Sequence, residues 1–335
     1  MANDTPNKAP GWNLVSLTIA PSTEEFASFL LFDLGTTGTI TMEESAEQIR
    51  LGAYFEENVE PHGIARAIKA GFARAGREQD LLAVSFSAVA DADWMQKWKE
   101  GFEPAAIGEQ LLVAPSWRLP ADPEGRVVIQ IDPGMAFGTG QHPTTKMCLE
   151  LLEAATEQFI VQGSGFRDQS PESSSQNLKT MNYELRTMNR GPAVLDLGTG
   201  SGLLAIAALR LGAATVLALD TDRVACRIAS ENIRQNGGDG RIVVKQGSLD
   251  AAGRRTFDLI LANLTAEPLI SLAPRLARSL RVRGCLITSG ILASEEERVA
   301  AIFRRCSMVP ERRRKGRGWV ALMCRGPVVS ARGAG

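Results

Sequence analysis

AVLDLGTGSGLLAIAALRLGA, residues 193–213, predicts an apolar strand ending near Asp196, a glycine turn and a helix of small residues. The next segment, TVLALD, predicts a second strand that ends in Asp220. Strand-like and helical segments then alternate as far as GCLITSGIL, residues 284–292. This alternation predicts a doubly wound α/β domain, a fold whose ligands bind at the carboxyl ends of the strands.

The glycines of the turn indicate what kind of ligand it holds. Gly198, Gly200 and Gly202 follow a G-x-G-x-G spacing, and Leu203 stands where a dinucleotide-binding turn would have its third glycine. Because a pyrophosphate needs close approach to the helix N-terminus, this turn favours a nucleoside ligand without pyrophosphate, such as S-adenosylmethionine. Asp220, at the end of the second strand, can accept hydrogen bonds from both ribose hydroxyls of either class of ligand.

Two further segments belong to the same prediction. ANLTAEPL, residues 262–269, puts Asn263 at the end of the fourth strand, where its amide faces the ligand crevice or caps the following helix. DPGMAFGTGQHPTT, residues 132–145, predicts a glycine-rich loop that enters a helix near Pro143. The residues of this loop do not by themselves distinguish a ligand-binding loop from a simple connection.

Length and composition limit the class of protein. The 335 residues are 44% hydrophobic and 22% charged, which is typical of a globular chain of about two domains. A formal net charge of −1 predicts no global attraction to nucleic acid or anionic lipid, so such binding would have to be local. The five cysteines are odd in number and form no CxxC pair, which argues against a disulfide framework or a metal site and favours a cytoplasmic location. The sequence offers no apolar leader and no long apolar run, so we expect no membrane segment.

The N-terminal part has a different pattern. From Trp12 to Val89, strand-like and helical periods follow one another in the order βαββαβ, which predicts a small α+β, ferredoxin-like domain over residues 12–90. Such a fold is also used to bind RNA, but its last strand lacks the aromatic and basic residues that stack bases.

Two segments are predicted to lie between or outside the domain cores. Residues 91–125, rich in tryptophan, predict a linker that packs between the domains. Residues 163–191 are polar and repeat TMN, which favours a mobile surface insertion. A short amphipathic helix with Leu178, Met181, Leu185 and Met188 on one face is the alternative for this second segment.

These motifs, in this order behind a ferredoxin-like start, closely resemble the PrmA family of bacterial ribosomal protein methyltransferases, from about Trp12 to Cys324. The resemblance implies a seven-stranded, Rossmann-like class I S-adenosylmethionine-dependent methyltransferase domain over residues 126–325. It also implies that the ferredoxin-like domain recognises the substrate. The implied substrate is protein eleven of the large ribosomal subunit, methylated on lysine side chains and on the N-terminal amine, with no nucleic acid or membrane required. The oligomeric state stays open.

The resemblance further implies which residues contact S-adenosylmethionine. These are Thr145, Gly198, Asp220 and Asn263, with the loop of residues 132–145 covering the cofactor. We extend this predicted site to Phe137, Gly138, Thr139 and Gly200.

Asn263 is also predicted as the catalytic residue that aligns the amine. His142 is the one histidine near the loop, but a general base is not required if the amine loses its proton to water before it is aligned. The alternatives are a methyltransferase of the same fold acting on another protein or on RNA, a dinucleotide oxidoreductase, and a scaffold protein that retains the cofactor pocket.

Overall fold

The computed structural model describes residues 12–36, 39–45, 47–56, 59–89, 102–132, 140, 142–163 and 191–326. The chain divides into two compact units, and the boundary between them falls between Glu103 and Pro104. Most of the predicted insertion, residues 164–190, lies outside the described residues. So do Phe137, Gly138 and Thr139 of the predicted cofactor site.

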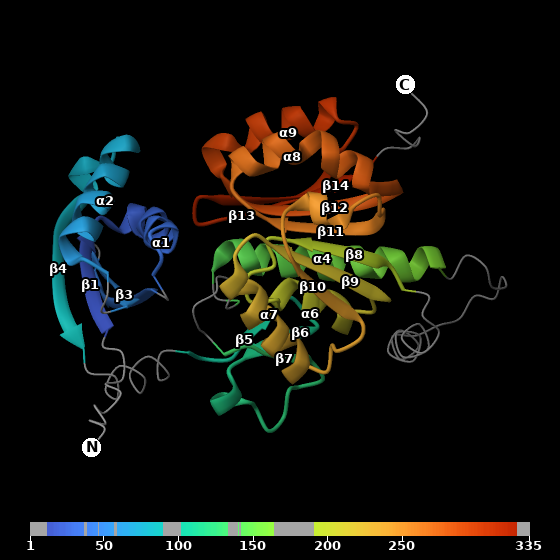
Figure 1. The fold of residues 1–335 in the computed structure, drawn as a ribbon, viewed down its shortest axis with the longest axis horizontal. Helices are drawn as coiled ribbons and strands as arrows, with labels where there is room; N and C mark the ends of the chain where they lie inside the picture. The colour runs from blue at the N-terminus through green and yellow to red at the C-terminus, as the bar shows by residue number, and fades with distance from the viewer. Residues whose placement is uncertain are drawn as a thin grey trace, which may run out of the picture. The chain divides into compact units, whose positions relative to one another are not determined.

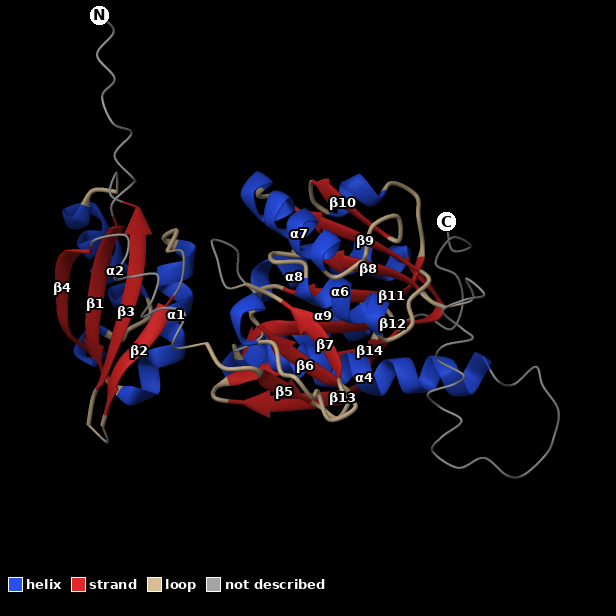
Figure 2. Ribbon diagram, turned by 90° about the horizontal axis from the view of Figure 1, so that it is seen from below, coloured by secondary structure: helices blue, strands red, loops and turns tan. Residues whose placement is uncertain are grey.

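The N-terminal unit is a four-stranded antiparallel sheet with two helices, and its strands lie in the order β2-β3-β1-β4 (Figure 2). Val15, Leu17 and Ile19 alternate along the first strand and are buried, because successive strand residues face opposite sides of a sheet. Phe26 and Phe72 join the two helices over the same core, with ring centroids 5.1 Å apart. The elements of this unit are β1 (Trp12–Ile19), α1 (Glu24–Asp33), β2 (Thr39–Glu44), β3 (Ile49–Glu56), α2 (Pro61–Arg74) and β4 (Leu81–Val89).

The C-terminal unit is built on a sheet with the strand order β10-β9-β8-β11-β12-β14-β13. The first five strands are parallel, and β14 runs antiparallel to both of its neighbours. From β8 the chain moves outward through β9 and β10 and then returns to β11 on the other side of β8, so the strand order reverses between β8 and β11. The strands are β8 (Ala193–Leu197), β9 (Thr215–Asp220), β10 (Ile242–Gln246), β11 (Phe257–Asn263), β12 (Leu280–Leu292), β13 (Val309–Gly316) and β14 (Trp319–Arg325).

Helices cover both faces of this sheet. Figure 1 shows α8 and α9 on one face and α4, α6 and α7 on the other. The central strands are therefore buried on both sides, which is why β8 and β11 are almost continuously apolar instead of alternating. The helices are α4 (Pro143–Gly163), α6 (Leu203–Arg210), α7 (Arg223–Gln235), α8 (Ala266–Ser279) and α9 (Glu296–Arg305).

A third, three-stranded sheet corrects the predicted linker. It consists of β5 (Ala105–Ile107), β6 (Leu111–Ala114) and β7 (Val127–Gln130), and β6 pairs in parallel with β7. The linker prediction of residues 91–125 is therefore wrong from Pro104 onward, and the C-terminal unit starts there instead of at residue 126.

Side chains from two helices bind this small sheet to the rest of the C-terminal unit. Glu153 of α4 accepts the backbone N–H groups of Glu109 and Gln110 in the β5–β6 turn, at 2.9 and 3.0 Å. Asn236, which follows α7, accepts the N–H of Gln130 and donates to its carbonyl, at 2.9 and 2.7 Å. Helices α4 and α7 both cover the large sheet. The segment from Pro104 therefore packs with the C-terminal unit and does not act as a linker.

Candidate active site

The turn that follows β8 contains three glycines in backbone conformations that other residues rarely adopt. Gly198, Gly200 and Gly202 have φ values of +75°, +53° and +83°, in the left-handed region that favours glycine. A Cβ on Gly198 would lie 2.6 Å from a methyl carbon of Leu264, the residue after Asn263. The end of β11 and the turn after β8 are therefore in close contact, and side chains at the turn would disrupt this packing.

Asp196 lies fully buried beneath this turn. Its Oδ2 accepts the hydroxyl of Thr199 at 2.6 Å and the backbone N–H of Ala205 at 3.1 Å. Its Oδ1 has no hydrogen-bond partner among the described residues. Burial, with a smaller contribution from the charge of Asp220, raises the pKa of Asp196 to about 7, against the lowering effect of the Thr199 hydrogen bond. Burial therefore favours the protonated acid up to about neutral pH.

Asp196→Asn is expected to gain stability relative to the parent protein as the pH rises from 5 to 8. The native pKa is above the unfolded value of about 3.9, so the contribution of Asp196 is fully present below pH 4 and is lost as pH rises through 7. The difference of about 3 pKa units corresponds to roughly 4 kcal/mol between about pH 3 and pH 8, and roughly two thirds of this change falls between pH 5 and pH 8. Asparagine copies the protonated acid and does not titrate. Urea unfolding of both proteins at pH 5 and pH 8 measures the change, and an unchanged difference between them would contradict a neutral Asp196.

Asp220 presents a fixed carboxylate at the end of β9, next to the glycine turn. Its Oδ2 accepts the N–H of Gly200 at 2.9 Å, and its Oδ1 accepts the N–H of Asp222 at 3.0 Å. Each carboxylate oxygen has a further acceptor site, so the side chain can take additional hydroxyl donors without losing these bonds. Two fixed oxygens at a strand end match the two adjacent hydroxyls of a ribose.

Asn263 is the last residue of β11 and is held by the first turn of α4. Its Nδ2 donates to the hydroxyl oxygens of Thr144 and Thr145, at 3.3 and 3.4 Å. Thr265 is the N-cap residue of α8, so the interpretation of Asn263 as a helix cap is wrong. Because the NH₂ group is directed to α4, the carbonyl Oδ1 is the end of the amide left to accept a hydrogen bond from a ligand.

His142 contacts Thr144 and so helps to fix the position of the Thr144 hydroxyl. Its Nδ1 lies 2.7 Å from the Thr144 hydroxyl and accepts the Thr144 backbone N–H at 3.3 Å. The imidazole packs edge-on against Trp319, with ring centroids 5.6 Å apart. Burial lowers the pKa of His142 to about 4, so the ring is neutral at pH 7 and is a weak base. Its contacts fix the Thr144 hydroxyl, which in turn accepts from Asn263.

The structure brings five of the predicted site residues to one edge of the sheet. These are Thr145, Gly198, Gly200, Asp220 and Asn263. The remaining three, Phe137, Gly138 and Thr139, fall outside the described residues.

Sequence reasoning missed two parts of the site. Asn263 donates to the hydroxyl of Thr144 as well as to that of Thr145. The two adjacent threonines after Pro143 are the sequence feature that could have indicated this role for Thr144. Trp319, the ring that packs against His142, has no signal in its own neighbourhood because it comes from β14, far along the chain.

Metal ions, disulfides and membrane spans find no suitable arrangement of residues in the described part of the chain. No cluster of three or more histidine, cysteine, aspartate or glutamate side chains is placed there to hold a metal ion. All five cysteines are described and carry free thiols. Among the described helices, none combines the length and the apolar character needed to cross a membrane.

The chain is similar over most of its length to known proteins. Residues 12–326 match the family model described as "Ribosomal protein L11 methyltransferase (PrmA)". The chain is 35% identical to a ribosomal protein L11 methyltransferase of Pelobacter propionicus, covering 94% of this chain and 97% of that protein. It is 32% identical to one of Chloroflexus aurantiacus, covering 94% and 98%. A solved ribosomal protein L11 methylase of Lactobacillus delbrueckii subsp. bulgaricus is 28% identical with a TM-score of 0.51, covering 67% of this chain and 100% of that one.

Proposed function

We propose, because this chain belongs to the ribosomal protein L11 methyltransferase (PrmA) family, that Asp220 binds the methyl donor and Asn263 faces the amine. The protein is an S-adenosylmethionine-dependent methyltransferase that acts on lysine side chains of ribosomal protein L11. The observation that carries the residue assignment is the meeting of Asp220, Gly200 and Asn263 at the carboxyl ends of three adjacent strands.

The donor set fits the cofactor. S-adenosylmethionine supplies an electrophilic methyl group on a sulfonium, which an amine takes in an in-line displacement. Asp220 holds the ribose hydroxyls with the acceptor sites that Gly200 and Asp222 leave free. The left-handed backbone of Gly198 and Gly200 forms the turn over which the cofactor would lie, and Thr145 accepts a hydrogen bond from Asn263 Nδ2 beside it. Phe137, Gly138 and Thr139 remain predicted contacts from the loop that precedes α4.

The residue that the reaction most needs is one that stabilises a neutral amine. A lysine has a reference pKa of about 10.4, so near pH 7.4 its neutral form is about one part in a thousand, a cost of roughly 4 kcal/mol. Asn263 Oδ1 accepts a hydrogen bond from the amine and so directs the nitrogen lone pair along the line of transfer. His142, neutral and with a low pKa, does not supply the base, so the proton leaves to water before the amine is aligned.

The test is a methylation assay on defined substrates. The protein is incubated with methyl-labelled S-adenosylmethionine and with unmethylated ribosomal protein L11, and mass spectrometry locates the label. We expect label on lysine side chains and on the N-terminal amine, without added RNA or membrane. Label on ribosomal RNA or on a different ribosomal protein, with L11 unmodified, would support the alternative substrates and contradict the assignment. Binding of NAD in preference to S-adenosylmethionine would contradict the cofactor.

We also propose that the N-terminal unit is a ferredoxin-like domain that recognises the substrate protein in the cytoplasm. Its strand order, with β1 and β3 in the centre and a helix after β1 and after β3, supports this description. The described residues of the proposed cofactor site, Thr145, Gly198, Gly200, Asp220 and Asn263, come from the C-terminal unit, so the N-terminal unit is available for a separate task.

A truncated protein that begins at Pro104 is expected to bind S-adenosylmethionine with unchanged affinity but to methylate L11 at least tenfold more slowly. The start must lie at Pro104, because a cut near Val127 would remove two strands of the small sheet that packs on α4 and α7. Calorimetric titration with the cofactor and initial rates on L11 measure the two properties. Full activity of the truncated protein would reject the recognition role.

A further inference from the structure

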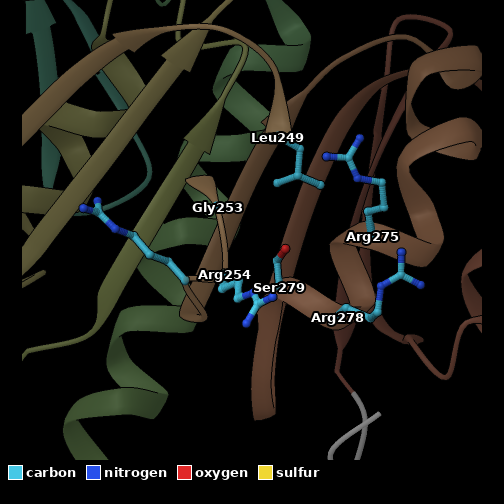
Figure 3. Close-up of a pocket in the computed structure, with 7 residues that line it drawn as sticks. Leu249, Gly253, Arg254, Arg275, Arg278 and Ser279 are labelled. Carbon is cyan, nitrogen blue, oxygen red and sulfur yellow. The ribbon is translucent and has the colours of Figure 1, made fainter. Parts of the chain in front are cut away.

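A pocket of about 400 Å³ lies away from the proposed active site and is lined mostly by arginines. Figure 3 shows Arg275 and Arg278 on α8 and Arg254 near the start of β11, with Leu249 and Ser279 between them. Arg254 and Arg255 precede β11, whereas Asn263 is its last residue. The length of β11, about 20 Å, therefore separates this pocket from the methyl-transfer site.

The charge of this pocket is one-sided. Among the described residues that line it, four are arginines and none is acidic; the set is Leu249, Gly253, Arg254, Arg255, Arg275, Arg278 and Ser279. Arg275 forms an ion pair with Asp250, an exposed residue next to Leu249, so the charge of this one arginine is compensated and that of the other three carries the argument. The whole chain has a net charge of −1, so this local excess of positive charge is not a consequence of composition.

The helix dipole accounts for only part of the cluster. Arg278 lies in the last turn of α8, where a cation offsets the partial negative charge of the helix C-terminus. Arg254 and Arg255 come from a different element, the exposed segment between the Leu249–Ala252 turn and β11, and no helix ends with them. Arginines from two separate elements thus line one hollow, and their combined positive charge suits an anionic ligand.

We propose that this pocket binds a phosphate group, carried either by a free nucleotide or by an RNA strand. A guanidinium binds phosphate oxygens with two parallel hydrogen bonds, and several guanidiniums suit a ligand that offers more oxygens and more charge than one carboxylate. The Ser279 side chain adds a hydroxyl donor to the lining. The volume falls within the usual range for small-ligand sites.

The experiment compares two full-length double variants that each lose two positive charges. The first carries Arg254→Gln and Arg278→Gln in the pocket. The control carries Arg227→Gln and Arg234→Gln, two exposed positions on α7. Binding of AMP and of a mixed-sequence, single-stranded RNA of twelve nucleotides is measured at several salt concentrations. Melting temperature and S-adenosylmethionine affinity, which we expect to be unchanged in both variants, show that the fold and the active site are intact.

We expect the pocket variant to bind at least tenfold more weakly and the control to change less than twofold. For RNA, the slope of log affinity against log salt should fall by about one. If the pocket variant loses binding of both AMP and RNA, the pocket binds the phosphate of a free nucleotide. If it loses binding of RNA alone, the pocket binds phosphates of an RNA strand. The proposal is overturned if the unmodified protein binds neither probe, or if both variants lose binding equally. It is also overturned if polyglutamate competes as well as RNA with the same dependence on the arginines.

Discussion

Asn263→Ala is expected to lower the rate of methyl transfer by at least about a hundredfold, which corresponds to some 2.7 kcal/mol of transition-state stabilisation. The substitution removes the carbonyl oxygen that we propose holds the amine, whereas Asp220 and the glycine turn are untouched. Cofactor affinity should therefore fall much less than the rate. Single-turnover methylation of L11 with saturating S-adenosylmethionine measures the rate, and calorimetric titration measures the affinity.

Four further variants separate alignment of the amine from a structural role of Asn263. Asn263→Asp should also be slow, because a carboxylate favours the charged ammonium over the neutral amine. Asn263→Ser shortens the side chain and should not restore the rate, and near-parental rates in this variant would exclude the catalytic role. Thr144→Val removes the hydroxyl that accepts from Asn263 Nδ2 and should reduce the rate, whereas Thr144→Ser, which keeps the hydroxyl, should retain it.

The part of this site that the sequence predicts is the part set by neighbouring residues. A strand that ends in an acidic or amide residue places that residue at the ligand edge of a parallel sheet, so Asp220 and Asn263 follow from the pattern. The bond from Gly200 to Asp220 likewise joins two consecutive strand ends.

Contacts between distant segments could not be predicted in the same way. The orientation of the Asn263 amide depends on Thr144, and the burial of His142 depends on Trp319 of a late strand. In neither pair does the sequence around one residue indicate that it contacts the other. A prediction from sequence therefore finds the residues of the site but not the hydrogen bonds that orient them.

The prediction of a linker over residues 91–125 was wrong for a related reason. Strands β5 and β6 have three and four residues, and all four residues of β6 are buried, so neither shows the alternation that identifies a strand. Their stability comes from pairing with β7 and from Glu153, which caps the turn between them from α4. The tryptophans of residues 91–125 were a clearer sequence feature than these short strands. They indicated that the segment is packed, but not that it forms a sheet.

Asp220→Ala is expected to weaken S-adenosylmethionine binding roughly tenfold to 150-fold. The carboxylate would lose charge-assisted hydrogen bonds to the ribose, worth about 1.5 to 3 kcal/mol. It would also lose its bonds to the N–H groups of Gly200 and Asp222, so the turn over which the cofactor lies would be less fixed. Calorimetric titration with the cofactor measures the change in affinity directly.

Asp222 provides a matched control for the loss of charge. It lies two residues from Asp220 and caps α7 by accepting the N–H of Val224 at 2.8 Å, a bond that asparagine also makes. Asp222→Asn should therefore keep the helix cap and change the cofactor affinity less than twofold, whereas Asp220→Asn should lose most of what Asp220→Ala loses. Equal losses at both positions would mean that general electrostatics, and not a ribose contact, governs binding. Unchanged affinity in both Asp220 variants would show that Asp220 does not bind the cofactor, because Asp220→Ala removes both of the carboxylate oxygens that we propose contact the ribose.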